Sequence, residues 1–364
     1  MNAPDEAYLR FRNVKKTYDQ ESLVVKDFSL DVAKGEFLTL LGPSGSGKST
    51  VLMMLAGFES VTSGDISIDG VSITRLPPYR RNIGMVFQNY ALFPHMTIEE
   101  NLAYPLSVRK MPKARVRERV GEYLGLIAMQ KFGKRYPGQL SGGQRQRVAL
   151  ARALIFEPSL VLMDEPLGAL DKKLREQMQY EITRLHEMMG YTVIYVTHDQ
   201  TEALSMSDRI AVFDDGVVQQ CATPAELYEL PRNAFVADFI GENNFIRGKV
   251  CAVENDHVQI RLPHGEVVGA RCATGLKLEQ EAVLSVRPEK LFIEPTRHDS
   301  DNRVQARYLT RHYVGDFIRY YFEVTEGVEI TVKVLNDLTA PQFSEGDTAG
   351  LVWLSKDCSA YPAR

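Results

Sequence analysis

The stretch that decides the fold is Gly42-Pro43-Ser44-Gly45-Ser46-Gly47-Lys48-Ser49-Thr50. It fits the pattern G-x-x-x-x-G-K-[ST], in which glycines let backbone N–H groups turn toward phosphate oxygens. The strand-like run Glu36-Phe-Leu-Thr-Leu-Leu41 leads into it, and a helical pattern follows, with its inner side formed by Val51, Leu52, Leu55 and Ala56. A flexible Gly-Ser loop is the alternative, but the strand–loop–helix context favours a phosphate-binding loop.

This loop predicts binding of Mg-ATP. The following helix adds its positive N-terminus to the backbone N–H groups. Lys48 is expected to reach the β- and γ-phosphates, and the Ser49 hydroxyl is placed to ligate Mg²⁺.

A second element carries acids at the end of a buried strand. Leu160-Val-Leu-Met163 is an apolar run followed by Asp164 and Glu165. We expect Asp164 to hold Mg²⁺ through water and Glu165 to act as general base or to orient the attacking water. Because Pro166 follows, a helix cap is the alternative for this pair alone.

Two further polar residues follow predicted strands. His198 comes after the strand Thr192-Val-Ile-Tyr-Val196 and Thr197, and Gln88 follows Ile83-Gly-Met-Val-Phe87. Ligands of open α/β sheets bind at such strand ends, so His198 is expected to contact the γ-phosphate and Glu165. Gln88 is expected to ligate Mg²⁺ or position water. On its own, a histidine is more often structural than catalytic and a glutamine is uninformative.

The most specific signal is Leu140-Ser141-Gly142-Gly143-Gln144, a second glycine-rich turn that leads into a helix. It offers a second anion-binding helix N-terminus. A chain with one lysine-bearing phosphate loop has no use for it on its own nucleotide. We therefore expect Ser141, Gly142, Gly143 and Gln144 to cap ATP bound to another copy.

Apolar periodicity divides the chain into two domains. Strands alternate with helical patterns up to about residue 242, which is typical of an α/β domain with a largely parallel sheet. One long amphipathic helix is indicated by Leu174, Met178, Ile182, Leu185 and Met189, and Gly190 should end it. A periodicity of four residues at Val116, Val120 and Leu124 indicates another helix.

The texture changes in residues 243–364. Ile318-Arg-Tyr-Tyr-Phe-Glu-Val324 and Val328-Glu-Ile-Thr-Val-Lys-Val334 alternate apolar and polar residues, with Thr325-Glu-Gly327 between them as the turn of a hairpin. Val258, Ile260 and Leu262 alternate likewise. These patterns predict a second, all-β domain, a small barrel or sandwich.

Bulk properties narrow the class of protein. The 364 residues carry 44% apolar and 25% charged side chains with a net charge of −4, so no nucleic-acid footprint is indicated. The four cysteines are scattered, which argues against a disulfide framework or zinc site and favours a reducing compartment. Met-Asn-Ala-Pro-Asp-Glu at the start lacks signal-peptide features, and no apolar run approaches about 18 residues. We expect work at a membrane only by docking on a partner.

Together these motifs resemble the ATP-binding subunits of ABC transporters in order and spacing, over essentially the whole chain. Gln88 matches the Q-loop, residues 140–144 the LSGGQ signature and residues 160–165 the Walker B strand. Leu167-Gly-Ala-Leu-Asp171 matches the D-loop, with Gly168 where many members have Ser, and His198 matches the switch histidine. Tyr18 corresponds to the aromatic residue that stacks on adenine.

The resemblance implies an ABC-type P-loop NTPase domain, residues 1–242, followed by an OB-like TOBE-type regulatory domain, residues 243–364. It implies a homodimer of nucleotide-binding subunits that sandwiches two ATP molecules between the loop of one copy and the signature of the other. Closure on ATP would drive integral membrane permease subunits fed by a periplasmic or extracellular solute-binding protein. The chain would then lie peripherally on the cytoplasmic face of the bacterial inner membrane.

Other segments refine the class. Asn89-Tyr-Ala-Leu-Phe-Pro-His-Met-Thr-Ile98 resembles the region that contacts the permease, with core packing under a loop as the alternative. Ser285-Val-Arg-Pro-Glu289 and Tyr313-Val-Gly-Asp-Phe317 resemble the importer extension, which either regulates the ATPase or stabilises the dimer. The stretch from Pro78-Tyr-Arg-Arg-Asn-Ile-Gly84 to His95 looks most like the spermidine/putrescine branch.

Two alternatives differ in partner. A ferric iron or sugar importer would share every motif, because the binding protein and permease choose the solute. A soluble ABC ATPase of translation or DNA repair belongs to another class. Such proteins carry long coiled coils or two nucleotide domains in one chain, and neither pattern is visible here.

Overall fold

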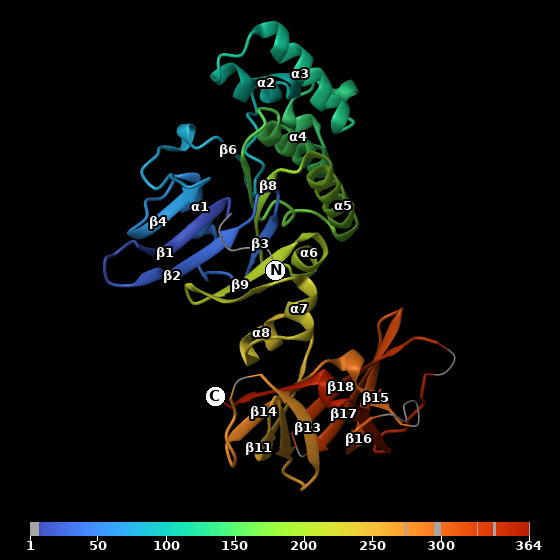
Figure 1. Ribbon diagram of the computed structural model, residues 1–364. Coiled ribbons are helices and arrows are strands. Elements are labelled where there is room, and N and C mark those ends of the chain that lie inside the picture. Colours follow the sequence, from blue (N-terminus) through green and yellow to red (C-terminus); the bar gives the residue numbers. More distant parts are fainter. Residues whose placement is uncertain (1–6, 274, 295–299, 326, 338–339, 364) are drawn as a thin grey trace. The chain divides into compact units, whose positions relative to one another are not determined.

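The computed structural model describes residues 7–273, 275–294, 300–325, 327–337 and 340–363 (Figure 1). The chain divides into two compact units, residues 1–224 and 225–364. The boundary expected at 242/243 stays a prediction. The acidic N-terminal six residues and Glu326 of the predicted turn lie outside the described residues.

One ten-stranded sheet organises the first unit, in the order β5-β4-β1-β2-β10-β9-β3-β8-β7-β6. Its strands are β1 (Leu9–Thr17), β2 (Leu23–Val32), β3 (Phe37–Leu41), β4 (Ser63–Ile68), β5 (Val71–Ser72), β6 (Ile83–Val86), β7 (Leu160–Asp164), β8 (Thr192–Thr197), β9 (Arg209–Asp214) and β10 (Val217–Ala222).

The five strands β9, β3, β8, β7 and β6 are parallel to one another. Every residue of β3 and β8 is buried, and most of these residues are apolar, as expected of parallel strands that are covered on both faces. Strands β1, β2, β4 and β5 pair antiparallel beside them. The predicted α/β domain with a largely parallel sheet is confirmed.

Helices cover both faces of this sheet. They are α1 (Lys48–Ala56), α2 (Ile98–Val108), α3 (Lys113–Leu126), α4 (Gly142–Leu154), α5 (Lys172–Met189) and α6 (Gln200–Met206), with short 3₁₀ turns at Pro78–Arg80, Gln130–Phe132 and Pro137–Gln139. The α1 side chains pack with Leu38, Leu160 and Ile194 on one face. The α4 and α5 side chains pack with Val161 and Val193 on the other. Among the described residues, no helix is long and apolar enough to cross a membrane.

Capping residues set the ends of α5. The Asp171 side chain accepts a hydrogen bond from the Leu174 N–H, 3.1 Å, and so satisfies one donor of the first turn. Gly190 ends the helix with φ of +63°, a left-handed conformation that glycine adopts without steric cost. Both ends agree with the predicted helix.

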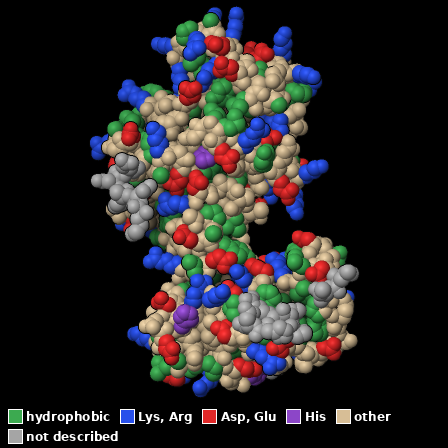
Figure 2. Space-filling model, turned by 45° about the vertical axis from the view of Figure 1, so that its right-hand side comes forward, with side chains coloured by type: hydrophobic (Ala, Val, Ile, Leu, Met, Phe, Trp, Pro, Cys, Tyr) green, Lys and Arg blue, Asp and Glu red, His purple; other side chains and the backbone are tan. Residues whose placement is uncertain are grey.

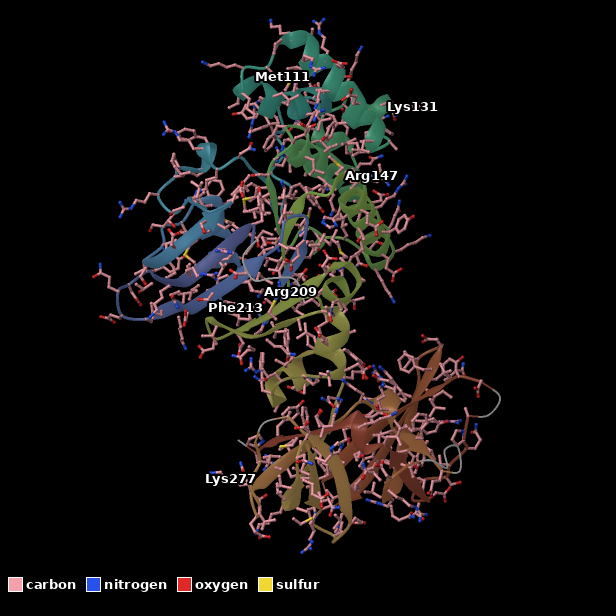
Figure 3. All side chains as sticks on the ribbon, viewed as in Figure 1. Met111, Lys131, Arg147, Arg209, Phe213 and Lys277 are labelled. Carbon is pink, nitrogen blue, oxygen red and sulfur yellow. The ribbon has the colours of Figure 1, made fainter. Side chains whose placement is uncertain are left out.

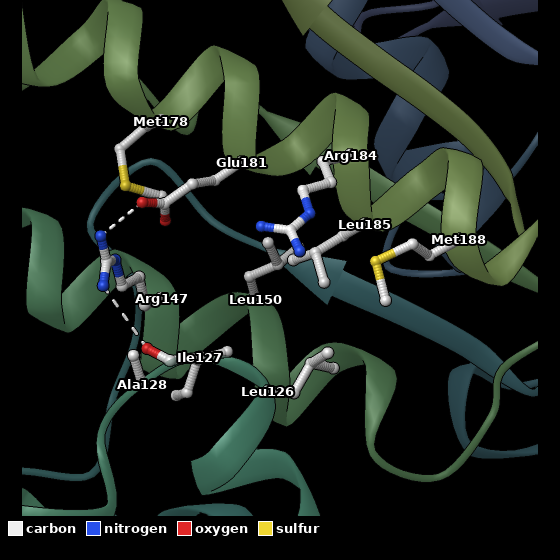
Figure 4. Close-up of a pocket in the computed structure, with 10 residues that line it drawn as sticks. All are labelled: Leu126, Ile127, Ala128, Arg147, Leu150, Met178, Glu181, Arg184, Leu185 and Met188. Carbon is white, nitrogen blue, oxygen red and sulfur yellow. Dashed lines mark hydrogen bonds and ion pairs between the residues drawn. The ribbon is translucent and has the colours of Figure 1, made fainter.

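Arg147 joins three helical segments around a small cavity (Figure 4). Its guanidinium pairs with Glu181 of α5 and contacts the Ile127 carbonyl at the end of α3. Leu150 and Leu185 supply much of the apolar lining. Since Arg147 belongs to α4, this ion pair fixes the helix whose first residues form the second glycine-rich turn.

The second unit is built mainly of strands. Its elements are α7 (Pro224–Glu229), α8 (Ala234–Phe239), β11 (Asn244–Glu254), β12 (His257–Arg261), β13 (Val267–Cys272), β14 (Glu281–Val286), β15 (Phe292–Ile293), β16 (Asn302–Tyr313), β17 (Phe317–Thr325), β18 (Val328–Leu335), β19 (Thr348–Trp353) and β20 (Cys358–Pro362), with 3₁₀ turns at Pro288–Lys290 and Ser355–Asp357. Strands β11, β12, β13, β20 and β14 close into a barrel. Strands β15, β19, β16, β17 and β18 form a second sheet.

The alternation of apolar and polar residues in this unit corresponds to strands, as predicted. The β17 and β18 strands pair antiparallel, and Tyr320, Phe322, Ile330 and Val332 point into the core.

Arg287 is a charged residue that is nevertheless buried in this unit. It donates to the carbonyls of Ala237, Glu242 and Tyr228, at 3.0–3.2 Å, and thereby ties the two short helices to the barrel.

Lys and Arg side chains lie among Asp and Glu side chains on the face seen in Figure 2. This mixture agrees with the small net charge of −4. The expectation of no nucleic-acid footprint remains a prediction.

A buried arginine closes the helix that carries the phosphate loop. Arg81 is 6% exposed and donates to the carbonyls of Met54 and Leu55 in the last turn of α1, at 2.7 and 2.8 Å. It also donates to the Leu76 carbonyl, 2.8 Å. Burial lowers its pKa. The last carbonyls of a helix lack the full set of intrahelical donors, and Arg81 adds donors to those of Met54 and Leu55; the Met54 carbonyl also accepts from the Gly57 N–H at 3.2 Å.

Arg81→Met should therefore lower the free energy of unfolding by about 2–4 kcal/mol, since it removes the guanidinium hydrogen bonds to the Met54, Leu55 and Leu76 carbonyls. Thermal unfolding followed by circular dichroism would measure the change. Arg80→Met is the matched control, because Arg80 is the exposed neighbour. Equal unfolding temperatures of the two variants would contradict the capping role.

Candidate active site

The glycine-rich loop connects the end of β3 to Lys48, the first residue of α1. Gly47 has φ of +104°, and a Cβ atom there would lie 2.9 Å from the Val24 carbonyl oxygen. A Cβ atom on Gly42 would lie 2.0 Å from the carbonyl oxygen of Phe213. Phe213 lies on β9 and is labelled in Figure 3. Both positions therefore require glycine, and the loop is pressed against neighbouring strands.

The loop offers donors to an anion. Within the part of the chain that the structure describes, the N–H groups of Gly45 and Gly47 donate to no protein acceptor. They lie at the N-terminus of α1, where the helix dipole favours negative charge. This loop therefore fits a phosphate group.

Lys48 is held within the loop. Its Nζ donates to the Pro43 carbonyl at 2.7 Å and to the Ser46 hydroxyl at 3.3 Å, and the residue is only 5% exposed. Burial lowers the pKa of Lys48, while Glu165 and Asp164 oppose that shift. Since an ammonium group has three donors, one remains for a phosphate oxygen.

Ser49 and Asp164 lie together as a metal site needs. The Ser49 hydroxyl donates to Asp164 Oδ1 at 3.0 Å, which joins the first turn of α1 to the end of β7. Burial and Glu165 raise the pKa of Asp164, and the Ser49 hydrogen bond and Lys48 lower it. A carboxylate and a hydroxyl are oxygen ligands of the kind that Mg²⁺ takes, with waters completing its shell. The residues fit this ion.

Glu165 is the centre of the cluster. Its Oε1 lies 3.1 Å from His198 Nδ1, and its Oε2 accepts from Gln88 Nε2 at 3.3 Å. The Glu165 backbone has φ of +44°, an uncommon conformation for a residue with a side chain, and its N–H donates to the Val196 carbonyl at 2.9 Å. The structure thus brings together the acid, amide and imidazole that the sequence placed at three strand ends.

Tyr18 lies directly after β1 with 58% of its surface exposed. The Lys16 ammonium lies 4.7 Å from the centre of its ring, and Lys16 is itself held by the Ser60 carbonyl at 2.9 Å and by Glu59 at 3.0 Å. This support leaves an exposed aromatic surface suited to stacking. The adenine role of Tyr18 remains a prediction.

The second glycine-rich turn forms the start of α4. The Ser141 hydroxyl accepts from the Gln144 N–H, and the Gln144 side chain accepts from the Ser141 N–H at 3.0 Å, which is a capping box. A Cβ atom on Gly143 would lie 2.8 Å from Leu174 of α5. Residues 140–144 and 42–50 form no hydrogen bond with one another among the described residues. Helices α4 and α1 pack on opposite faces of the sheet.

Residues 89–98 were predicted either to contact the permease or to pack into the core under a loop, and the structure shows both buried and exposed residues in this segment. Tyr90 is buried, and Arg152 donates to the Ala91 carbonyl at 2.8 Å. The half-buried Phe93 packs on Tyr104 with ring centres 4.7 Å apart. Pro94 and His95 remain exposed. Core packing therefore explains part of this segment, while the exposed part keeps its predicted docking role as a prediction.

Sequence reasoning missed the polar residues beneath His198. Arg175 of α5 pairs with Asp199, and Glu202 of α6 is buried with hydrogen bonds from Tyr195 and Thr197. Periodicity treats Arg175 as one polar residue of an amphipathic helix. The sequence offers one other hint of this network, the acids Asp199 and Glu202 shortly after His198. That hint is weak, because Asp199 is also explained as the N-cap of α6.

Comparison with known proteins agrees with this geometry. Residues 25–168 match the ABC transporter family, and residues 284–360 match the TOBE domain. The chain is 46% identical to the spermidine/putrescine import ATP-binding protein PotA of Rubrobacter xylanophilus, over 96% of this chain and 92% of that protein. It is 47% identical to PotA of Pseudomonas fluorescens, over 94% of each chain.

A solved structure agrees as well. It is the dimeric structure of a post-hydrolysis state of an ATP-binding cassette bound to ADP and Pi. It covers 59% of this chain and 98% of its own, with 37% identity and a TM-score of 0.54.

These matches confirm the predicted fold, an ABC-type ATPase domain followed by a β-rich TOBE domain, and the predicted class of ATPase coupled to transport. Residues 78–95 indicated the spermidine/putrescine branch of the family, and the names of these relatives agree with that prediction. The chain belongs to the family of ABC transporter ATP-binding proteins.

Proposed function

We propose that this chain is the ATP-hydrolysing subunit of an importer for spermidine and putrescine. The observation that carries hydrolysis is the contact of Glu165 with both His198 and Gln88, next to Lys48, Ser49 and Asp164. The assignment of the solute rests on relatives that share 46–47% identity over nearly the full length.

The roles follow from position. Lys48 and the loop N–H groups bind the β- and γ-phosphates and balance their charge. Glu165 takes a proton from the attacking water or orients it, while His198 holds the Glu165 carboxylate and reaches the γ-phosphate. Ser49, Asp164 and Gln88 would hold Mg²⁺, which when bound neutralises charge on the phosphate oxygens.

The proposed site is completed by a second copy. Residues 141–144 present a capped helix N-terminus and, within the described part of the chain, form no hydrogen bond with the loop of residues 42–50. In a head-to-tail homodimer this end would face the γ-phosphate bound by the partner. The dimeric state of the solved ATP-binding cassette supports this arrangement.

The proposed complex also contains integral membrane permease subunits and a solute-binding protein on the outer side. The chain would sit peripherally on the cytoplasmic face of the inner membrane, with residues 89–98 against the permease. Residues 243–364 would regulate the ATPase or stabilise the dimer. No role on nucleic acid is proposed.

Glu165→Gln should lower the rate of phosphate release at least about 100-fold while ATP still binds, because the amide keeps the shape and removes the base. A stable ATP-bound dimer should then accumulate. Phosphate release, binding of a fluorescent ATP analogue and light scattering would measure the three properties. Glu176→Gln, at an exposed position, is the control. Near-normal turnover of Glu165→Gln would remove the proposed base.

Mixing two inactive subunits tests the composite site. Lys48→Ala and Ser141→Arg each destroy both sites of their homodimer, but a mixed dimer keeps one intact site. With free exchange, an equal mixture should regain about a quarter of the intact sites. Phosphate release that stays at the level of the separate variants would argue against sites shared between copies.

Uptake tests the solute. A complex reconstituted with the permease and binding protein should accumulate labelled spermidine or putrescine only with ATP, and Glu165→Gln should stop it. Labelled ferric iron and maltose are the competing substrates. Transport of either in place of a polyamine would overturn the assignment of the solute without affecting that of the ATPase.

A further inference from the structure

A buried polar network lies under the histidine of the site. Glu202 is 2% exposed, and its Oε2 accepts from the Tyr195 hydroxyl at 2.7 Å and from the Thr197 hydroxyl at 2.8 Å. The Thr197 hydroxyl also accepts from the Asp199 N–H at 3.0 Å. Both neighbours of His198 in the chain are therefore fixed, while the His198 side chain stays 54% exposed.

Arg175 connects this network to a second loop. Its Nη1 donates to Asp199 Oδ2 at 3.0 Å, and its Nε lies 3.8 Å from Glu202 Oε1. Its Nη2 donates to the Leu170 carbonyl at 3.1 Å. Leu170 ends the turn that follows Glu165, in which the Gly168 N–H donates to the Glu165 carbonyl at 3.3 Å and the Leu170 N–H to the Leu167 carbonyl at 3.1 Å.

We infer that Arg175 is a positioning residue that sets the alignment of His198 with Glu165. One planar guanidinium holds the loop after His198 with one nitrogen and the loop after Glu165 with another. The contact between Glu165 and His198 links the same two loops a second time. This inference rests on the proposed function, because it assumes that the pair acts in hydrolysis.

The geometry explains why arginine is needed. Lysine would reach Asp199 or the Leu170 carbonyl as a single point charge, but it lacks the fork that holds both in fixed directions. Asp199 Oδ1 is occupied by the N–H groups of Thr201 and Glu202, at 2.8 and 3.2 Å. Arg175 therefore contacts the other carboxylate oxygen, Oδ2, and the orientation of the Asp199 carboxylate fixes the direction of this contact.

The test compares variants of the full chain in steady-state ATP hydrolysis. Arg175→Gln should lower kcat roughly 10- to 100-fold, the scale expected for misplaced catalytic groups, with little change in KM or in the Kd of a fluorescent ATP analogue. Arg175→Lys should recover part of kcat. Arg184→Gln, which changes an exposed arginine on the same helix, should behave like the unmodified chain.

Asp199→Asn supplies the coupling measurement. If the two residues act as one unit, the double variant should lose no more kcat than Arg175→Gln alone. Three results would each overturn the inference. The first is a double variant whose loss of kcat equals the product of the two single losses. The second is a parallel loss of kcat, ATP affinity and unfolding temperature, and the third is a kcat of Arg175→Gln above half of normal. Glu165→Gln separates the two levels. If it abolishes hydrolysis while Arg175→Gln remains normal, only this inference fails; if it stays active, the proposed function fails.

Discussion

The site depends on the register of the two parallel strands β7 and β8. Asp164 at the end of β7 pairs with Val196 of β8, so the next residue, Glu165, donates its N–H to the Val196 carbonyl. His198 lies two residues beyond Val196, which brings the imidazole beside the Glu165 carboxylate at 3.1 Å. Because side chains alternate between sheet faces, a slip of one residue would send these groups to opposite sides. Packing on both faces of the sheet fixes that register.

Charge is concentrated where this packing ends. Lys48, Asp164 and Glu165 gather at the carboxyl edge of strands that are buried and mostly apolar. Burial works against the ionised form of Lys48 and of Asp164, and the mutual attraction of the two residues restores part of it. Opposite charges within the cluster therefore offset part of the cost of burying Lys48 and Asp164.

Much of this could be predicted from the sequence because the informative signals are local. The pattern around Lys48, the apolar run before Asp164 and the capped turn at Ser141 each define a strand end or a helix start, and their order defines the fold. Arg175 and Glu202 could not be found in that way. Their roles arise from side-chain contacts that appear only in the folded chain. Arg175 contacts Asp199, 24 positions away, and Glu202 accepts from Tyr195, 7 positions away on the neighbouring strand. In sequence, each is one polar residue of a helix.

The same distinction applies to the two glycine-rich turns. The loop before α1 has unpaired N–H groups and a lysine within it, so its purpose can be derived from one chain. The turn before α4 satisfies itself through its capping box and is fixed by packing against α5 and by the Arg147–Glu181 pair. The proposed head-to-tail homodimer gives this rigid helix end a nucleotide to face, the one bound by the second copy. Rigidity there has a use, because the gap between two copies can respond to one phosphate group only if neither side deforms.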